Sequence, residues 1–113
     1  MCIRDSFTLG ENIADHGGLR IAYTALHNTF DGVEPAPIDG FTADQRFYLA
    51  YAALWAGNIR DAEILRLTKI DPHSLGRWRV NAALRNMETF FKAFDIKEGD
   101  AMYMAPEDRV IIW

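Results

Sequence analysis

The sequence predicts a mainly α-helical domain, and three observations lead to this prediction. In several segments the apolar residues recur at intervals of three and four positions, which places them on one face of a helix. Proline and glycine gather between these segments, where they interrupt helices and form turns. A chain of 113 residues, 50% hydrophobic and 25% charged, has the size and composition of one globular domain.

The first helix is predicted to begin at Glu11, directly after Gly10, and to end before Asp31. Small and apolar residues at four-residue intervals form a stripe of the kind that faces a core: Ala14, Gly18, Ala22, Leu26 and Phe30. Residues 32–40 contain two prolines, which a helix interior does not tolerate, so this segment is predicted to be a loop.

The second helix is predicted to follow Thr42, which forms the pattern of a capping box with Gln45. Its apolar residues occupy both faces: Phe47, Ala50, Tyr51, Leu54 and Trp55 on one, and Tyr48, Leu49, Ala52 and Ala53 on the other. The uninterrupted apolar run, residues 47–56, is about half the length that crosses a bilayer. We therefore expect a core helix that is buried on most sides, and no membrane span.

The second half of the chain is predicted to hold three shorter helices and a tail. The first covers about residues 60–68 and is followed by an irregular segment, 69–76, that contains Pro72 and Gly76. Another begins at Arg77, and a short one follows it. Their apolar stripes consist of Val80, Ala83, Leu84 and Met87, and of Phe90, Phe91 and Phe94. From Gly99 a loop is expected, with at most a short strand at residues 110–113.

Charge, cysteine and histidine content limit the function. Sixteen acidic against twelve basic residues give a net charge of −4, which repels nucleic acid and anionic lipid. Cys2 is the one cysteine, so no internal disulfide and no cysteine-based metal site is expected. His16, His27 and His73 lack the i, i+4 spacing of a helical zinc pair, so the chain by itself holds no complete metal site. The first residues lack the apolar stretch of a secretory signal.

Two pairs of residues could carry chemistry. Glu11 and Asp15 are four positions apart, on one face of the first helix. They either complement the dipole at the helix N-terminus or lie near a cation that removes their mutual repulsion. His73 and Arg79 flank the turn that proline and glycine constrain. Both donate hydrogen bonds, so they either recognise a carbonyl or oxyanion, or serve as an ordinary cap and a surface cation.

Three segments form an ordered set of motifs. Residues 10–19 read Gly-Glu-Asn-Ile-Ala-Asp-His-Gly-Gly-Leu, residues 71–81 read Asp-Pro-His-Ser-Leu-Gly-Arg-Trp-Arg-Val-Asn, and residues 109–113 read Arg-Val-Ile-Ile-Trp. They resemble the Glu-x-x-x-Asp, His-Ser-Pro-Gly-x-x-Arg and Arg-Val-x-x-Trp segments of the neprilysin and endothelin-converting-enzyme family of zinc metallopeptidases. The similarity covers residues 7–113, whereas residues 1–6 match nothing in the family. It implies the C-terminal helical part of a thermolysin-like (gluzincin) catalytic domain.

The resemblance also implies a role for each candidate residue. Glu11 corresponds to the third zinc ligand, and Asp15 to a carboxylate that orients a zinc-bound histidine. His73 corresponds to the residue that stabilises the oxyanion of the tetrahedral intermediate. Arg79 corresponds to the residue that binds a backbone carbonyl of the substrate.

Other positions match the family less closely. Leu54 and Trp55 correspond to a Val-Trp pair that lines the pocket for the substrate residue after the scissile bond, although an ordinary place in the core explains each of them about as well. Leu75 replaces the family's usual proline, which should loosen the turn. The cysteines that animal members place near Ala56, Asp95 and the C-terminus are absent, which points to a bacterial type.

The family's His-Glu-x-x-His helix, which supplies two zinc ligands and the general base, lies upstream of the matching segment and is missing here. We therefore expect the C-terminal fragment of an extracytoplasmic zinc endopeptidase that acts on peptides or small proteins. One Zn²⁺ and the missing N-terminal part of the same enzyme would complete it, and the chain alone would be inactive. The alternative is a free-standing helical domain that binds peptides or a partner without catalysis, through the turn between His73 and Arg79.

Overall fold

The computed structural model describes the backbone of residues 5–112 and the side chains of residues 7–112. Five α-helices and one 3-10 helix form this part of the chain: α1 (Asp5–Asn28), α2 (Ala43–Leu54), α3 (Asp61–Ile70), α4 (Gly76–Leu84), α5 (Glu88–Phe94) and η1 (Pro106–Asp108). No strand forms among these residues, although Ile38 and Phe41 make an isolated β-bridge. The predicted mainly α class is confirmed.

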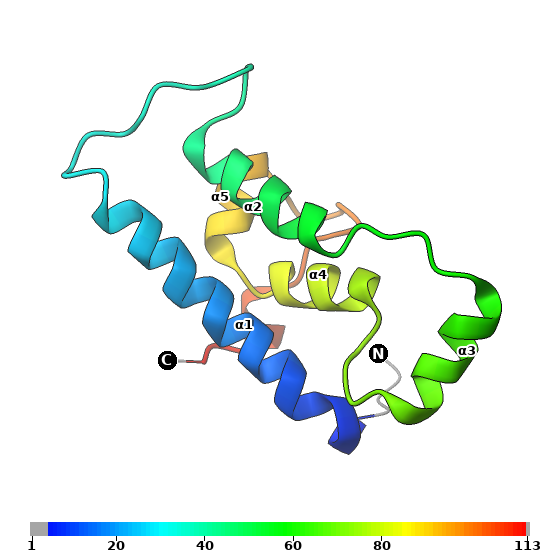
Figure 1. The fold of residues 1–113 in the computed structure, drawn as a ribbon. Helices are drawn as coiled ribbons and strands as arrows, with labels where there is room; N and C mark the ends of the chain where they lie inside the picture. Colours follow the sequence, from blue (N-terminus) through cyan, green and yellow to red (C-terminus); the bar gives the residue numbers. More distant parts are fainter. Residues whose placement is uncertain (1–4, 113) are drawn as a thin grey trace.

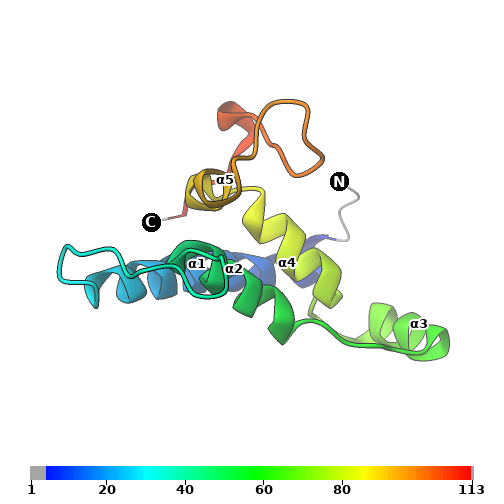
Figure 2. The same ribbon diagram turned by 90° about the horizontal axis from the view of Figure 1, so that it is seen from above.

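Figure 1 shows the course of the chain, and Figure 2 shows that α1, α2, α4 and α5 pack in two layers. α1 and α2 lie in one layer, and α4 and α5 cover one side of it, with the C-terminal tail beyond α5 (Figure 2). α4 contacts α1, and α5 contacts α2. α3 projects from one end of the molecule in both views and has no buried residue.

The core lies where α1, α2, α4 and α5 meet. Tyr48 of α2 is only 1% exposed, and its ring contacts the ring of Phe90 edge-on at a centroid distance of 5.4 Å. The other buried members of this cluster are Leu19, Ala83, Leu84, Met87 and Phe91. Removing these large apolar side chains from water stabilises the crossing of α1 and α4, the two elements that carry the candidate site.

α2 begins as the sequence predicts. Thr42 Oγ1 accepts a hydrogen bond from the Gln45 backbone N–H (3.2 Å), and Gln45 Oε1 accepts one from the Thr42 N–H (3.0 Å). These two bonds complete the capping box. The Gln45 side chain also donates to the carbonyl of Ala93 (2.9 Å), which ties the start of α2 to α5.

The prediction that α2 is buried on most sides is wrong within the described residues. Ala43 and Tyr48 are buried, but Leu49 is 43% exposed and Leu54 is 78% exposed. The face that carries Tyr48 packs on the core, and the described residues leave much of the opposite face uncovered.

The prediction that the stripe of small residues along α1 faces the core is also wrong. Ala14, Gly18 and Ala22 are exposed, and Leu26 and Phe30 are half-buried. A second stripe faces the core instead, through the buried Leu19 and the half-buried Tyr23. A leucine and a tyrosine bury more apolar surface than alanine and glycine, which favours this orientation.

The remaining boundaries follow the prediction to within two residues, with three differences, of which the first is η1, a short 3-10 helix inside the predicted C-terminal loop. α1 begins at Asp5 rather than at Glu11, although it ends at Asn28, before Asp31, as predicted. Residues 110–112 form no strand, and Trp113 lies outside the described residues. No helix in the described part of the chain is long and apolar enough to cross a membrane.

Candidate active site

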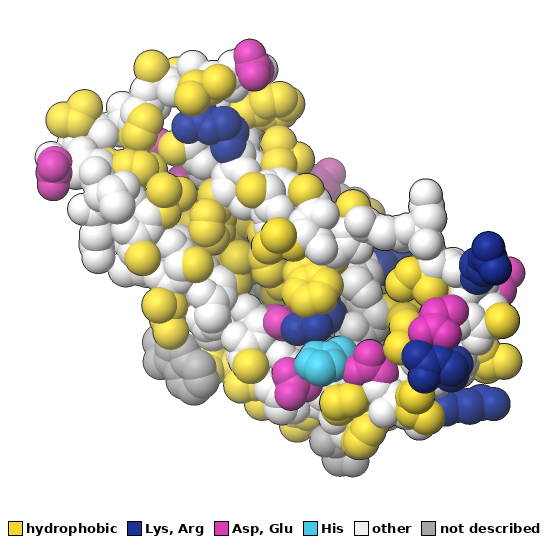
Figure 3. Space-filling view, in the orientation of Figure 1, with side chains coloured by type: hydrophobic (Ala, Val, Ile, Leu, Met, Phe, Trp, Pro, Cys, Tyr) yellow, Lys and Arg dark blue, Asp and Glu magenta, His cyan; other side chains and the backbone are white. Residues whose placement is uncertain are grey.

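Four of the predicted site residues come together where α1 meets the start of α4. Glu11 and Asp15 lie one turn apart on α1, His73 lies in the turn before α4, and Arg79 lies in α4. Arg79 pairs with Asp15, although 64 positions separate them in the sequence, and His73 lies against Glu11. Figure 3 shows this face of the molecule, on which a histidine lies among acidic and basic side chains.

Asp15 and Arg79 form a two-pronged ion pair. Nε and Nη2 of Arg79 donate to Oδ2 and Oδ1 of Asp15, both at 2.6 Å. Each side chain is only 13% exposed, so water screens the pair weakly. Hydrogen bonding to Asp15 raises the pKa of the Arg79 guanidinium above its usual value, which keeps it charged. The pair therefore holds a permanent cation in a defined plane beside α1.

The end of α2 packs against the other side of Arg79. The Cζ atom of Arg79 lies 3.8 Å from the centroid of the Trp55 ring. Tyr51, one turn earlier, donates a hydrogen bond from its hydroxyl to the Arg79 carbonyl (3.3 Å). A Cβ atom on Gly76 would lie 2.8 Å from the Trp55 carbonyl oxygen, so only glycine allows α4 to begin this close to α2.

His73 is held from one side by Asp71. Oδ1 of Asp71 accepts hydrogen bonds from the backbone N–H of His73 (2.9 Å) and from its ring Nδ1 (2.6 Å). A carboxylate accepts only, so Nδ1 carries a proton. Both bonds lower the pKa of the Asp71 carboxyl, and the bond from the backbone N–H has the larger effect. The other ring nitrogen, Nε2, lies 3.2 Å from Oε2 of Glu11.

Glu11 could supply one ligand to a metal ion. Its side chain is 44% exposed, and a carboxylate oxygen is one of the ligands that zinc takes in proteins. A catalytic zinc site needs three protein ligands, and the described residues bring no cluster of three or more metal-binding side chains together. The donor set therefore fits one part of a zinc site, to which other residues would have to contribute.

Leu54 lies outside this cluster. It is 78% exposed at the end of α2, whereas its neighbour Trp55 is half-buried against Arg79. Of the pair predicted to line a substrate pocket, the described part of the chain brings only Trp55 into contact with the site.

Asp71 was not predicted to act in the site, although it lies within the matching segment. A carboxylate two residues before a histidine is a signal for its contact, because aspartate side chains commonly bond the backbone two positions on. Tyr51 and Gly76 were likewise assigned no part in the site. Their contacts depend on how α2 approaches α4, which spacing along the chain does not specify.

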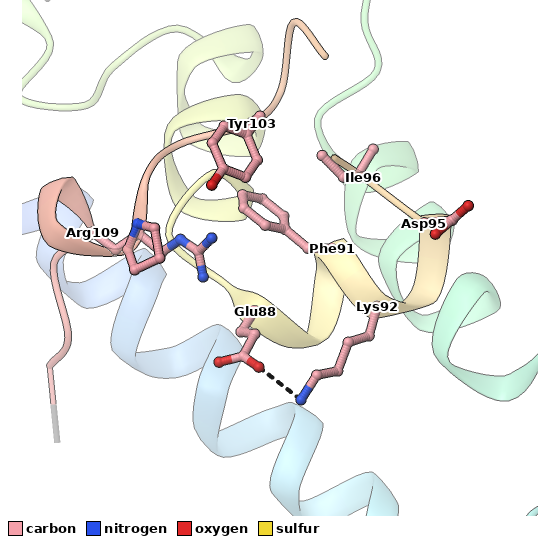
Figure 4. Close-up of a pocket in the computed structure, with 8 residues that line it drawn as sticks. Glu88, Phe91, Lys92, Asp95, Ile96, Tyr103 and Arg109 are labelled. Carbon is pink, nitrogen blue, oxygen red and sulfur yellow. Dashed lines mark ion pairs between the residues drawn. The ribbon is translucent and has the colours of Figure 1, made fainter. Parts of the chain in front are cut away.

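A hollow of about 430 Å³ between α5 and the C-terminal tail is a separate feature (Figure 4). Arg109 places its Cζ 4.4 Å from the Phe91 ring centroid and donates from Nε to the Met104 carbonyl (2.8 Å). Glu88 and Lys92 form an exposed ion pair at its edge. None of the predicted site residues lines this hollow, and the contacts of Arg109 anchor the tail to α5.

Comparisons with known proteins agree with the motifs. Residues 1–110 match the description "Peptidase family M13". The chain is 37% identical over 116 residues to Neprilysin-2 of Caenorhabditis elegans, covering all of this chain and 16% of that protein. It is 37% identical over 109 residues to Membrane metallo-endopeptidase-like 1 of Homo sapiens, covering 94% of this chain and 14% of that protein.

The fold is also that of a solved relative. The structure of the zinc metalloprotease Zmp1 of Mycobacterium tuberculosis in its open state superposes with a TM-score of 0.91 at 42% identity. The match covers 96% of this chain and 17% of Zmp1, so the chain spans about a sixth of the length of this relative. The resemblance to the neprilysin family is confirmed. Since the family match covers nearly the whole chain, including the four residues that meet at the start of α4, this chain belongs to peptidase family M13.

Proposed function

We propose that this chain is the C-terminal part of the catalytic domain of a zinc-dependent metalloendopeptidase that hydrolyses peptides or small proteins. The observation that carries the proposal is the meeting of Glu11 and Asp15 with His73 and Arg79. Support comes from the family match and from the likeness to the zinc metalloprotease Zmp1.

In this proposal Glu11 is one of three protein ligands of a single Zn²⁺. The two histidine ligands and the general base belong to an upstream His-Glu-x-x-His helix, so the N-terminal part of the enzyme is the partner that completes the site. Zinc, when bound, supplies Lewis-acid polarisation of the scissile carbonyl. The chain alone is then inactive, because one carboxylate cannot close a tetrahedral site.

His73 stabilises negative charge on the oxygen of the scissile carbonyl. The ring Nδ1 donates to Asp71, and Nε2 lies 3.2 Å from Oε2 of Glu11, the proposed zinc ligand. Asp71 fixes the orientation of the ring through Nδ1, and in this proposal Nε2 is the donor to the substrate oxygen, in place of its contact with Glu11. A fixed donor of this kind acts most strongly on charge that develops during the reaction.

Arg79 binds a backbone carbonyl of the substrate. Asp15 uses the Nε proton and one Nη2 proton, so the two Nη1 protons and the second Nη2 proton are left for other acceptors. Each Asp15 oxygen has a further lone pair, with which it can orient a histidine ligand of the upstream helix. Asp15 thus serves both the substrate-binding residue and the metal site.

The decisive test of the function uses the coding sequence and the protein that it specifies. The reading frame upstream of Glu11 is expected to encode His-Glu-x-x-His. The purified full-length protein is expected to contain one zinc per chain and to hydrolyse an internally quenched peptide, with activity lost on chelation and restored by zinc. A full-length protein without the upstream motif, or with the motif and zinc but no hydrolysis, would contradict the proposal.

We also propose an extracytoplasmic location. Support comes from Membrane metallo-endopeptidase-like 1 of Homo sapiens, whose alignment covers 94% of this chain and whose name refers to a membrane. Fractionation of cells that express the full-length protein tests this: activity confined to the cytosolic fraction would contradict it.

A further inference from the structure

We infer that Trp55 is a positioning residue for Arg79, holding the guanidinium in the plane in which it receives the substrate carbonyl. The inference rests on the proposed role of Arg79. It assigns to Trp55 a task different from lining a side-chain pocket, because the contact is made through the face of the ring with the cation itself.

The geometry of the contact supports stacking. The Cζ atom of Arg79 lies 3.8 Å from the Trp55 ring centroid, well within the distance of about 6 Å that a cation–π contact requires. Tryptophan is the strongest aromatic partner for such a contact, and the contact strengthens when the cation is removed from water. The Arg79 side chain, at 13% exposure, meets that condition.

Trp55 and Asp15 restrain Arg79 in different directions. The Asp15 carboxylate bonds Nε and Nη2 at the edge of the guanidinium and lies near its plane. The indole ring covers one face and opposes tilting out of that plane. With the carboxylate alone, the guanidinium could still rotate about the line of the two hydrogen bonds.

The position of Trp55 is itself fixed by the backbone. Its N–H donates to the Ala52 carbonyl at the end of α2 (3.2 Å), and its own carbonyl packs against Gly76 at the start of α4. Its ring Nε1 is buried. The ring is therefore oriented by packing, by the cation and by its contact with Tyr51.

A neighbouring pair provides a matched comparison. Arg77 and Trp78, also in α4, form a looser contact, with 5.6 Å between Cζ and the ring centroid. Trp78 is 55% exposed, and this pair contains neither Asp15 nor any other site residue. Trp78→Leu removes an indole from α4, the helix of Arg79, and leaves the contact between Arg79 and Trp55 in place.

The test is steady-state kinetics on the zinc-loaded full-length enzyme, with peptides that differ only in the side chain after the scissile bond. Trp55→Leu is expected to raise KM by roughly five- to thirtyfold for every peptide and to leave kcat within about twofold. Trp55→Phe, which keeps an aromatic face, should recover much of the loss. The double variant of Trp55→Leu and Arg79→Ala should have the same KM as Arg79→Ala alone. The control Trp78→Leu should have the KM of the wild type.

Fluorinated tryptophans at position 55 provide a version of this test in which the shape of the side chain and the folding of the protein are preserved. Successive fluorine atoms weaken the attraction of the ring face for a cation with little change in size, so log KM should rise with each fluorine. A KM that stays constant across the fluorinated series would overturn the inference, as would a loss that depends on the peptide side chain, which indicates a pocket wall. If Arg79→Ala itself left KM unchanged, the proposed role of Arg79 would fail, and the inference with it. If Arg79→Ala raised KM and Trp55→Leu did not, only the inference would fail.

Discussion

Asp15 and Arg79 are joined by two hydrogen bonds of 2.6 Å across 64 positions of sequence. One lies on α1 and the other on α4, and each side chain is 13% exposed. The pair connects the carboxylates of α1 to the substrate-binding side of the proposed site. It also makes the site dependent on the packing of these two helices.

Asp15→Asn should lower the stability of the full-length protein, because it leaves the Arg79 charge partly buried with a weaker acceptor. Hydrogen bonds to charged groups contribute about 1.5–3 kcal/mol each, so the midpoint of thermal unfolding should fall clearly. Glu88→Gln is the matched control, since Glu88 pairs with Lys92 at the surface. A midpoint lowered equally by both variants would show that Asp15 and Arg79 are no more than a surface ion pair.

Glu11→Gln should remove zinc and activity together from the full-length protein. An amide oxygen is a poor substitute for a carboxylate at a metal that needs an anionic ligand. Asp15→Asn should instead weaken zinc affinity by about 10–100-fold, the usual effect of a group that orients a ligand. Elemental analysis after dialysis and titration against a chelator separate the two. Wild-type zinc and activity in Glu11→Gln would disprove the ligand assignment.

The fold shows what spacing along the sequence can and cannot specify. Apolar periodicity located α1 and α2, and the pattern of Thr42 and Gln45 located the capping box. Both features depend on neighbours within a few residues along the chain. It did not select the buried face of α1, since the stripe of Ala14 and Gly18 and the stripe of Leu19 and Tyr23 have the same period. Only the packing partners distinguish the two.

The candidate site shows the same division. The family motifs placed Glu11, His73 and Arg79 in one site, and the structure brings them together. The direct bond from Asp15 to Arg79 was not predicted, because it depends on the angle at which α4 crosses α1. The stacking of Trp55 on Arg79 depends in the same way on the approach of α2 to α4.

His16 should make stability depend on pH. Burial, and secondarily the charge of Arg20, lowers the pKa of His16 below its usual value of 6.5, and the side chain is buried in the folded chain. The unfolded chain therefore binds the proton more readily. Above pH 6.5, the usual pKa, His16 is neutral in both states and its contribution to the free energy of unfolding does not change with pH. As the pH decreases from 6.5 to the lower pKa of the folded chain, the free energy of unfolding decreases by up to about 1.4 kcal/mol per pH unit.

His16→Asn, which does not titrate, should reduce this pH dependence. The measurement is the midpoint of thermal unfolding of the zinc-free protein at about pH 7.5 and at about pH 5.5, for wild type and variant. The wild type should lose more between the two conditions than the variant does. An equal loss in both would show that His16 is protonated alike in the folded and unfolded chains.

His73→Ala should lower kcat by about 10²–10³ and leave KM nearly unchanged, because the charge assigned to it appears only in the transition state. Asp71→Asn should lower kcat by less, since the ring remains but loses the acceptor of its Nδ1 proton. Kinetics with confirmed zinc content measures both. If Asp71→Asn raised KM and left kcat unchanged, Asp71 would act on substrate binding and not through the ring.

Arg79→Ala should raise KM and weaken inhibitors that mimic a peptide backbone, with a smaller change in kcat. The carbonyl assigned to Arg79 is present in the substrate and in the transition state alike, so losing the contact weakens both. Arg79→Lys should not restore KM, because one ammonium cannot bond both oxygens of Asp15 in the plane of a fork and also present fixed donors to the substrate. The measurements are steady-state kinetics and inhibitor binding on protein whose zinc content matches the wild type. A variant Arg79→Ala that lost kcat alone, beside a His73→Ala that lost KM alone, would reverse the two roles.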